Sequence, residues 1–370
     1  MITLDDYIAD FGEEPGYLDF ARFGPIGSAV RSEGLAQGAM LEHARFGTIA
    51  ALDEQDARFR AATAAVTGFR ADQVVFQPSR RLALLHATFG LTGVLALTDH
   101  SRFTIPAARA SDALGVLRPH WLAPDHGRVT PSDLRDLDSS VTAVAVTLVD
   151  PRTGYTVDLE GIRQVIGDRL LIVDAHQGFG VVDAPLDLAD VVVSGGHAWL
   201  RSGPGTGFMA LSDRAVDELT PVFTDALDDA VDVSFEEPLT PDRTAAAYRG
   251  GHPDPVAQAR MAAALERLAE VGVSAVQARV AEVVSAIIDL ADEFALPVVS
   301  PRDEAERAGI VVFEPQPEQV TTLVASLHNH GVTATAHTSM VRVSPHVSTD
   351  QDTLGMLRDS MVSFSTAITH

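Results

Sequence analysis

Short apolar runs alternate along the chain with longer amphipathic segments. Six runs rich in valine, leucine and alanine have the length of strands, at residues 73–76, 94–97, 142–147, 170–174, 190–194 and 207–211. Most are separated by segments long enough for a crossover helix, such as residues 79–89 and 158–166, and residues 52–68 read as an earlier helix that ends at a glycine. The alternation predicts a largely parallel sheet covered by helices.

The pattern changes after about residue 253. Two strong amphipathic helices are predicted at residues 255–271 and 274–296, followed by a strand at 309–313, a helix that runs to Asn329, and a short apolar run at 339–344. Helices with a few short strands are typical of a smaller α+β domain. We therefore expect a large α/β domain over residues 23–254 and a small α+β domain formed by residues 1–22 and 255–370.

Composition narrows the class of protein. Hydrophobic residues make up 46% of the 370 positions, which excludes a disordered chain. The net charge of −24 repels polyanions, so we expect neither a nucleic-acid partner nor a membrane partner, but a small-molecule or cationic ligand; a local basic pocket remains compatible with this charge. The N-terminus shows no basic region followed by an apolar core, which predicts a cytoplasmic protein.

Two residue types are absent. The chain has no cysteine, which excludes disulfides, thiolate metal sites and a cysteine that carries sulfur as a persulfide. It also has no lysine, because all 27 basic residues are arginines; with abundant alanine, valine, aspartate and glycine, this indicates a GC-rich coding bias. No metal site is predicted: His328 and His330 precede Gly331 at a helix end, where polar residues and a glycine cap are expected.

Candidate chemistry gathers at the ends of two predicted strands. One buried run ends at Asp174 and continues Ala-His-Gln-Gly-Phe-Gly, with Gln177 in the loop; the next run ends in Ser-Gly-Gly-His, with His197 last. Ligands of open parallel sheets bind at the carboxyl ends of the strands. Asp174, Gln177 and His197 are therefore expected to point into one crevice.

These residues, in this order, resemble the class V aminotransferase family, which are fold type I enzymes dependent on pyridoxal phosphate. The matching positions are Asp174, Gln177, Gly180, Ser194, His197, Trp199, Leu200, Gly203, Pro204, Gly207 and Phe208. The resemblance implies a large domain with a mostly parallel seven-stranded sheet covered by helices, a smaller α+β domain, an amino acid-like ligand and a homodimer. Less specific motifs at residues 16–25 and 153–154 look most like those of actinobacterial hercynylcysteine sulfoxide lyases of ergothioneine synthesis.

The resemblance also implies roles for four residues. Asp174 would keep the pyridine nitrogen protonated, and Gln177 would donate a hydrogen bond to the ring oxygen. His100 falls where the family stacks a side chain on the ring, and Arg342 matches the family's clamp for the substrate carboxylate. A structural role for His100 and a surface ion pair for Arg342 are the alternatives.

The phosphate-binding residues depart from the family pattern. Ser79 is a predicted N-cap followed by Arg80 and Arg81, which oppose the helix dipole unless an anion lies nearby. Their guanidinium groups could hold a phosphate, or both could face water. His252 stands where the family often has a threonine that reaches the phosphate of the partner subunit.

The largest departure is Ala198, which takes the place of the lysine that the family links covalently to its cofactor. No other lysine can replace it, so any pyridoxal phosphate would be bound non-covalently. Three interpretations stay open. The protein is a degenerate member or pseudoenzyme that binds a ligand or partner; it is an aminotransferase or C–S lyase that uses free cofactor with His197 as base; or Ala198 is an engineered substitution for lysine.

Overall fold

The computed structural model describes residues 2–98, 104–224 and 242–369. Its centre is a seven-stranded sheet with the order β1-β7-β6-β5-β4-β2-β3, in which β7 alone of the described strands runs antiparallel to its neighbours. The strands are β1 (Val74–Phe76), β2 (Gly93–Thr98), β3 (Leu117–Leu122), β4 (Val141–Thr147), β5 (Leu170–Asp174), β6 (Val191–Gly195) and β7 (Gly207–Leu211). This mixed, mostly parallel sheet confirms the predicted fold class.

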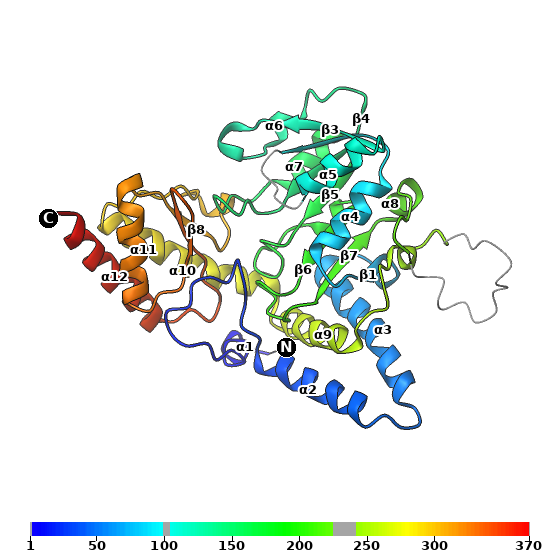
Figure 1. Cartoon of the computed structure of the whole chain (residues 1–370), viewed down its shortest axis with the longest axis horizontal. Helices are drawn as coiled ribbons and strands as arrows, with labels where there is room; N and C mark the ends of the chain where they lie inside the picture. The colour runs from blue at the N-terminus through cyan, green and yellow to red at the C-terminus, as the bar shows by residue number, and fades with distance from the viewer. Residues whose placement is uncertain (1, 99–103, 225–241, 370) are drawn as a thin grey trace.

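Helices cover both faces of this sheet (Figure 1). On one face, α4 (Arg80–Gly90), α5 (Thr104–Ala113) and α8 (Asp213–Glu218) share a hydrophobic cluster with the strands. On the other, α3 (Thr48–Thr67), α7 (Leu159–Ile166) and α9 (Pro255–Val271) share a second cluster. Alternate residues of β5 enter the two clusters: Leu171 and Val173 pack on one face, and Leu170 and Ile172 on the other.

A second sheet of three antiparallel strands lies toward the C-terminus. It consists of β8 (Val311–Phe313), β10 (Val341–Val343) and β9 (Thr335–Ala336), in that order. The remaining α-helices are α1 (Leu4–Ile8), α2 (Ser28–Glu42), α6 (Pro131–Leu134), α10 (Val273–Glu293), α11 (Val320–Asn329) and α12 (Gln351–Thr369). Helix α9 packs against α2 and α3, and the position of the domain boundary stays a prediction.

The six predicted strands of the large sheet are all present, and one strand was missed. The missed strand, β3, reads Leu-Arg-Pro-His-Trp-Leu and lies at the sheet edge. An edge strand tolerates proline and exposed polar residues, so it lacks the apolar run that marks the central strands. The helix expected at residues 52–68 begins earlier, at Thr48, and ends as predicted at Gly68, which has a φ of 79°.

No single helix of the described residues is long and apolar enough to span a membrane. Helices α9 and α10 meet that standard only when taken together, and they are bent by 83° at their junction.

A buried arginine joins three distant segments beside the sheet. Arg201 is 1% exposed; its guanidinium donates to the Glu13 carboxylate and to the Ser348 hydroxyl (3.0 Å), and it lies 3.8 Å from the centroid of the Phe11 ring. Arg201 itself has a φ of 58°, an uncommon conformation for a residue with a side chain. The ion pair therefore ties the turn after β6 to the N-terminal segment and to the loop before α12.

We expect Glu13→Gln to lower the free energy of unfolding by about 3 kcal/mol, because it leaves a buried guanidinium without its counter-charge. Burial raises the pKa of Glu13, but Arg201 and Ser348 outweigh it and hold that pKa below the ordinary value of 4.5. The pair therefore stabilises the fold above pH 4.5, and this contribution is lost as the pH falls through the lowered pKa. Urea unfolding measures the effect. The exposed neighbour Glu14 provides a control, since Glu14→Gln should change the free energy of unfolding by less than about 0.5 kcal/mol. Equal effects of the two substitutions would contradict a stabilising role for the Arg201–Glu13 ion pair.

Candidate functional site

A cleft of about 1120 Å³ opens at the carboxyl ends of the parallel strands. Thr98, Thr147 and Asp174, the last residues of β2, β4 and β5, line one wall. The turn between β9 and β10 and Arg342 on β10 line the opposite wall. Asp174, Gln177 and His197 all line this cleft, so the structure brings together the three residues that strand order places at one crevice.

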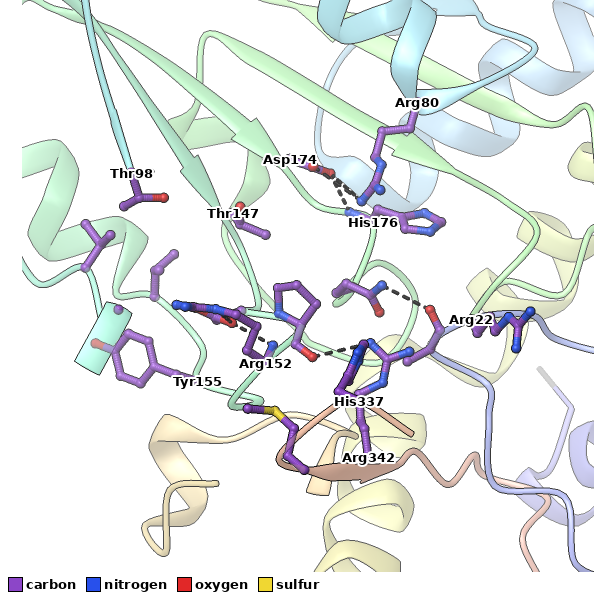
Figure 2. A pocket seen from close by; sticks show the side chains of 18 of the residues that line it. Arg22, Arg80, Thr98, Thr147, Arg152, Tyr155, Asp174, His176, His337 and Arg342 are labelled. Atoms are coloured by element: carbon purple, nitrogen blue, oxygen red, sulfur yellow. Dashed lines mark hydrogen bonds and ion pairs between the residues drawn. The ribbon is translucent and has the colours of Figure 1, made fainter. Parts of the chain in front are cut away.

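Asp174 and Arg80 form a buried ion pair at one end of the cleft. The Arg80 Nη1 atom lies 3.3 Å and 3.4 Å from the two carboxylate oxygens of Asp174, and the backbone amide of His176 donates to Oδ1 at 3.2 Å. Both side chains are nearly inaccessible to solvent. Figure 2 shows Arg80 reaching from the start of α4 to this carboxylate. Arg80, at the start of α4, and Asp174, at the end of β5, are therefore directly connected.

Two histidines lie beside this ion pair. The rings of His176 and His197 are 4.8 Å apart, and Nδ1 of His176 is 3.1 Å from the carbonyl oxygen of Gly195. Burial lowers the pKa of His197, and the nearby Arg80 charge lowers it further. Burial likewise holds the pKa of His176 well below its ordinary value. Both rings are therefore neutral at pH 7, and His197 has a lone pair that can accept a proton.

Gln177 is held at both ends of its amide. Its Nε2 donates to the carbonyl oxygen of Ala21 at 3.0 Å, and its Oε1 accepts a hydrogen bond from Trp199 Nε1 at 3.1 Å. These bonds connect the loop after β5 to the N-terminal segment and to the turn after β6. Among the described residues, Nε2 makes this one hydrogen bond with one of its two hydrogens. The contact with a cofactor ring oxygen stays a prediction.

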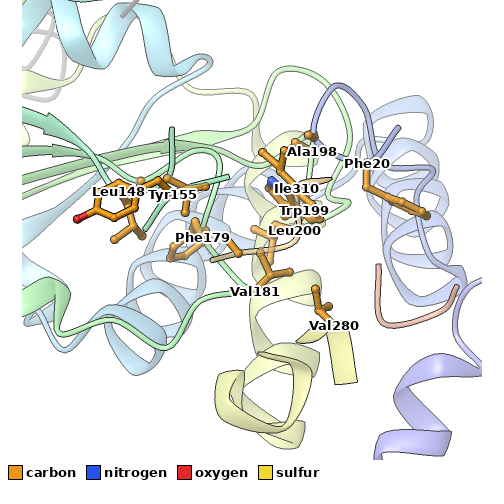
Figure 3. Close-up of a cluster of buried hydrophobic side chains, with 14 of the residues drawn as sticks. Phe20, Leu148, Tyr155, Phe179, Val181, Ala198, Trp199, Leu200, Val280 and Ile310 are labelled. Carbon is orange, nitrogen blue, oxygen red and sulfur yellow. The ribbon is translucent and has the colours of Figure 1, made fainter. Parts of the chain in front are cut away.

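Ala198 is fully buried, whereas its neighbour His197 lines the cleft. Ala198 belongs to the hydrophobic cluster that contains Trp199 and Leu200, as Figure 3 shows. The backbone on either side is anchored: Gly24 donates its amide to the carbonyl oxygen of His197 at 2.8 Å. Of these two residues, only the histidine presents a functional side chain to the cleft.

Of the other residues predicted to bind phosphate, Ser79 and Arg81 line the cleft and His252 does not. Ser79 caps α4, with its hydroxyl accepting from the Leu82 amide at 3.3 Å, and it lines the cleft with the exposed Arg81. His252 is exposed and does not line the cleft of the described chain. His100 lies outside the described residues.

Arg342 lies on the opposite wall from Asp174. It is 8% exposed, donates to the carbonyl oxygen of Pro151 at 3.3 Å and to the Thr335 hydroxyl at 3.4 Å, and has Asp19 at 3.8 Å. Burial lowers the pKa of Arg342 and raises that of Asp19. The Nε atom of Arg342 is buried and has no hydrogen-bond partner among the residues that the structure describes. Arg342 also lines the cleft, where a guanidinium can bind a carboxylate.

The cleft contains functional side chains that the sequence pattern did not single out. They are Arg22, Arg152, Tyr155, His176 and His337. Arg152 lies in the loop that follows the predicted strand at residues 142–147, and His176 is two residues after Asp174. The rule that ligands bind at strand ends could therefore have identified both. Arg22 and His337 approach from segments distant in sequence, where no such signal exists.

Solved structures share this fold. The apo cysteine desulfurase from Thermococcus onnurineus NA1 superposes with a TM-score of 0.85 at 20% identity, covering 99% of both chains. The cystine C–S lyase C-DES, in complex with its product cysteine persulfide, gives a TM-score of 0.83 at 15% identity, covering 94% of this chain and 97% of the lyase. A mutant of C-DES, with glycine covalently linked to its pyridoxal phosphate cofactor, gives 0.83 at 16% identity and covers 94% of this chain and 96% of the mutant. No curated protein matches the chain.

The sequence itself gives the family. Residues 90–368, most of the chain, match the model of the aminotransferase class-V family. The matched region includes Asp174, Gln177, His197 and Arg342, and the seven-stranded sheet has the architecture that the resemblance implied. The chain belongs to the aminotransferase class-V family.

Proposed function

We propose that this protein is a degenerate class V aminotransferase that binds an amino acid-like ligand in its cleft and holds pyridoxal phosphate without a covalent link. One observation carries the proposal. Ala198, which we align with the family's lysine, is fully buried, and the chain contains no lysine. The covalent step on which the family's standard catalysis depends is therefore closed to this chain.

The donor groups of the cleft fit the non-covalent contacts that pyridoxal phosphate makes. Asp174 offers a carboxylate to a pyridine nitrogen, and Arg80 and Arg81 stand in the first turn of α4, where backbone amides and guanidinium groups favour a phosphate. The guanidinium of Arg342, on the other wall, offers donors to a ligand carboxylate. When bound, pyridoxal phosphate supplies an electron sink for a carbanion formed beside the ligand's amino group.

Arg80 could either pair with Asp174 or hold the phosphate of the cofactor. It neutralises Asp174 in this structure, and it is also the buried guanidinium nearest the start of α4. A phosphate at the helix end would compete with Asp174 for this guanidinium. Release of Arg80 from Asp174 would then free the carboxylate for a pyridine nitrogen, so one side chain couples the two ends of the site.

The sulfur chemistry of the structural neighbours supports a C–S lyase ancestry more than a desulfurase activity. A desulfurase needs a cysteine to carry sulfur away as a persulfide, and this chain has no cysteine. The closer resemblance to hercynylcysteine sulfoxide lyases stays a prediction. So do a homodimer and a cytoplasmic location.

We expect incubation with pyridoxal phosphate followed by borohydride to leave no cofactor attached inside the cleft. Only an amine can form the reducible imine, and the α-amino group is the one amine that the chain offers. Peptide mass spectrometry after reduction measures this. Ala198→Lys serves as the matched positive control and should gain a link at residue 198. A stable link within the cleft of the unsubstituted protein would overturn the proposal.

Non-covalent cofactor binding should depend on Asp174. Asp174→Asn removes the charge that a protonated pyridine needs, and we expect it to weaken pyridoxal phosphate binding at least roughly tenfold. Equilibrium dialysis measures the affinity, with Asp112→Asn, an exposed aspartate on α5, as the control. Equal affinities of the Asp174→Asn variant and the unsubstituted protein would show that the cofactor does not use this carboxylate.

A second candidate function is an enzyme that uses free cofactor, with His197 as its proton acceptor. The observation in its favour is that His197 lines the cleft and that burial and the Arg80 charge lower its pKa, so the neutral, basic form is present at pH 7. His197 thus meets the chemical requirement for moving a proton at the ligand's Cα, which the lysine meets elsewhere in the family.

This candidate predicts that the protein and pyridoxal phosphate together accelerate exchange of the Cα proton of an amino acid with D₂O. His197→Gln should slow the exchange at least roughly 100-fold, because it removes the base. Since burial and the Arg80 charge lower the pKa of His197 below 6.5, the rate should be independent of pH above 6.5 and should fall as the pH drops through that lowered pKa. Proton NMR follows the exchange, and His120→Gln, on the exposed side of β3, is the control. No exchange with the unsubstituted protein would exclude this second function.

A further inference from the structure

Arg152 is held in place on the cleft wall by two features of the surrounding loops. Asp150 accepts from the backbone amide of Arg152 at 2.7 Å, from its Nη2 at 3.0 Å and from its Nε at 3.4 Å. The guanidinium lies against Gly127, where an added Cβ would come within 2.1 Å of Nη2. Gly127 also has a φ of 73°, a conformation that favours glycine, and a side chain at this position would occupy the space of the guanidinium. The side chain remains 39% exposed toward the cleft.

Arg152 and Arg342 lie on either side of a single peptide group. Arg342, from β10, donates to the carbonyl oxygen of Pro151, the residue directly before Arg152. Figure 2 shows both side chains on the side of the cleft away from the Arg80–Asp174 pair. The second wall of the cleft therefore presents two guanidinium groups from different parts of the chain.

The charges at this end of the cleft do not balance. Arg22 lies 4.0 Å and Arg342 3.8 Å from the same carboxylate, that of Asp19, while Arg152 is paired with Asp150. Among the described residues here, three arginines face two carboxylates, which leaves one positive charge in a protein whose net charge is −24. An amino acid with two acidic groups carries one net negative charge at pH 7 and would neutralise this excess.

We propose that Arg152 is a second anion receptor, so that the cleft selects an amino acid with an acidic side chain: Arg342 binds one acidic group of the ligand and Arg152 binds the other. This inference rests on the proposed function, because it takes the cleft to be the ligand site. It adds the chemical class of the ligand and the residue that selects it. An uncharged side chain of the same shape leaves the Arg152 guanidinium facing only Asp150 and water.

Isosteric pairs of ligands test this directly. Isothermal titration calorimetry should show L-glutamate binding at least roughly tenfold more tightly than L-glutamine, or L-aspartate more tightly than L-asparagine, because only the acid pairs with Arg152. Arg152→Gln should abolish this discrimination and leave the affinity for the amide unchanged. Arg152→Lys keeps the charge and should retain part of it. Arg342→Gln should weaken the acid and the amide alike, and Arg118→Gln, an exposed arginine on β3, should change nothing.

The outcomes separate this inference from the function on which it rests. Equal binding of acid and amide by the unsubstituted protein, or discrimination that survives Arg152→Gln, would overturn the role of Arg152 and leave the ligand site standing. Failure of all four amino acids to bind would overturn both this inference and the ligand-binding role. Discrimination that disappears with Arg152→Gln alone would establish the second receptor.

Discussion

The turn after β6 has its shape because Arg201 is buried with Glu13. A guanidinium with almost no solvent contact needs hydrogen-bond acceptors within the protein. For Arg201 these are Glu13, in the N-terminal segment, and Ser348, in the loop before α12. The positive φ of Arg201 is sustained by these contacts. The same turn carries His197, which lines the cleft, and the buried Ala198 beside it, so the Arg201–Glu13 ion pair holds both residues in position.

The electrostatics of the cleft follow from where the chain places its few arginines. Five of the 27 line the cleft, beside two carboxylates, in a protein with 51 acidic residues. At one end, the Asp174–Arg80 pair is buried and self-neutralising, and the desolvation of both groups makes it sensitive to any ligand that competes for either partner. At the other end, positive charge is in excess and partly exposed. The field inside the cleft therefore favours a small anionic molecule, even though the protein as a whole repels anions.

The sequence predicted those parts of the site whose positions depend on local order in the chain. Asp174 ends a central strand of continuous apolar residues, and parallel strands place their carboxyl ends at one edge, so its meeting with His197 could be predicted from the pattern alone. The direction taken by Arg80 could not, because the choice between phosphate, water and Asp174 depends on a contact between residues 94 positions apart. Arg152 shows both sides of this limit. Its place in the loop after a central strand makes it a candidate for the site, but the direction of its guanidinium depends on the space beside Gly127, which leaves no periodic signal in the sequence.

Alanine at residue 198 is compatible with the fold because the packing around it is apolar and complete. An ammonium group at a fully buried position costs free energy unless it is neutralised or joined to a cofactor, whereas alanine there buries only a methyl group. Trp199 and Leu200 pack in the core, and the indole of Trp199 finds its partner in Gln177 without any ligand. The turn therefore draws its stability from the protein's own contacts. The charged groups of the cleft are held in the same way, Arg80 by Asp174 and Arg342 by the carbonyl oxygen of Pro151, so these charges are preorganised.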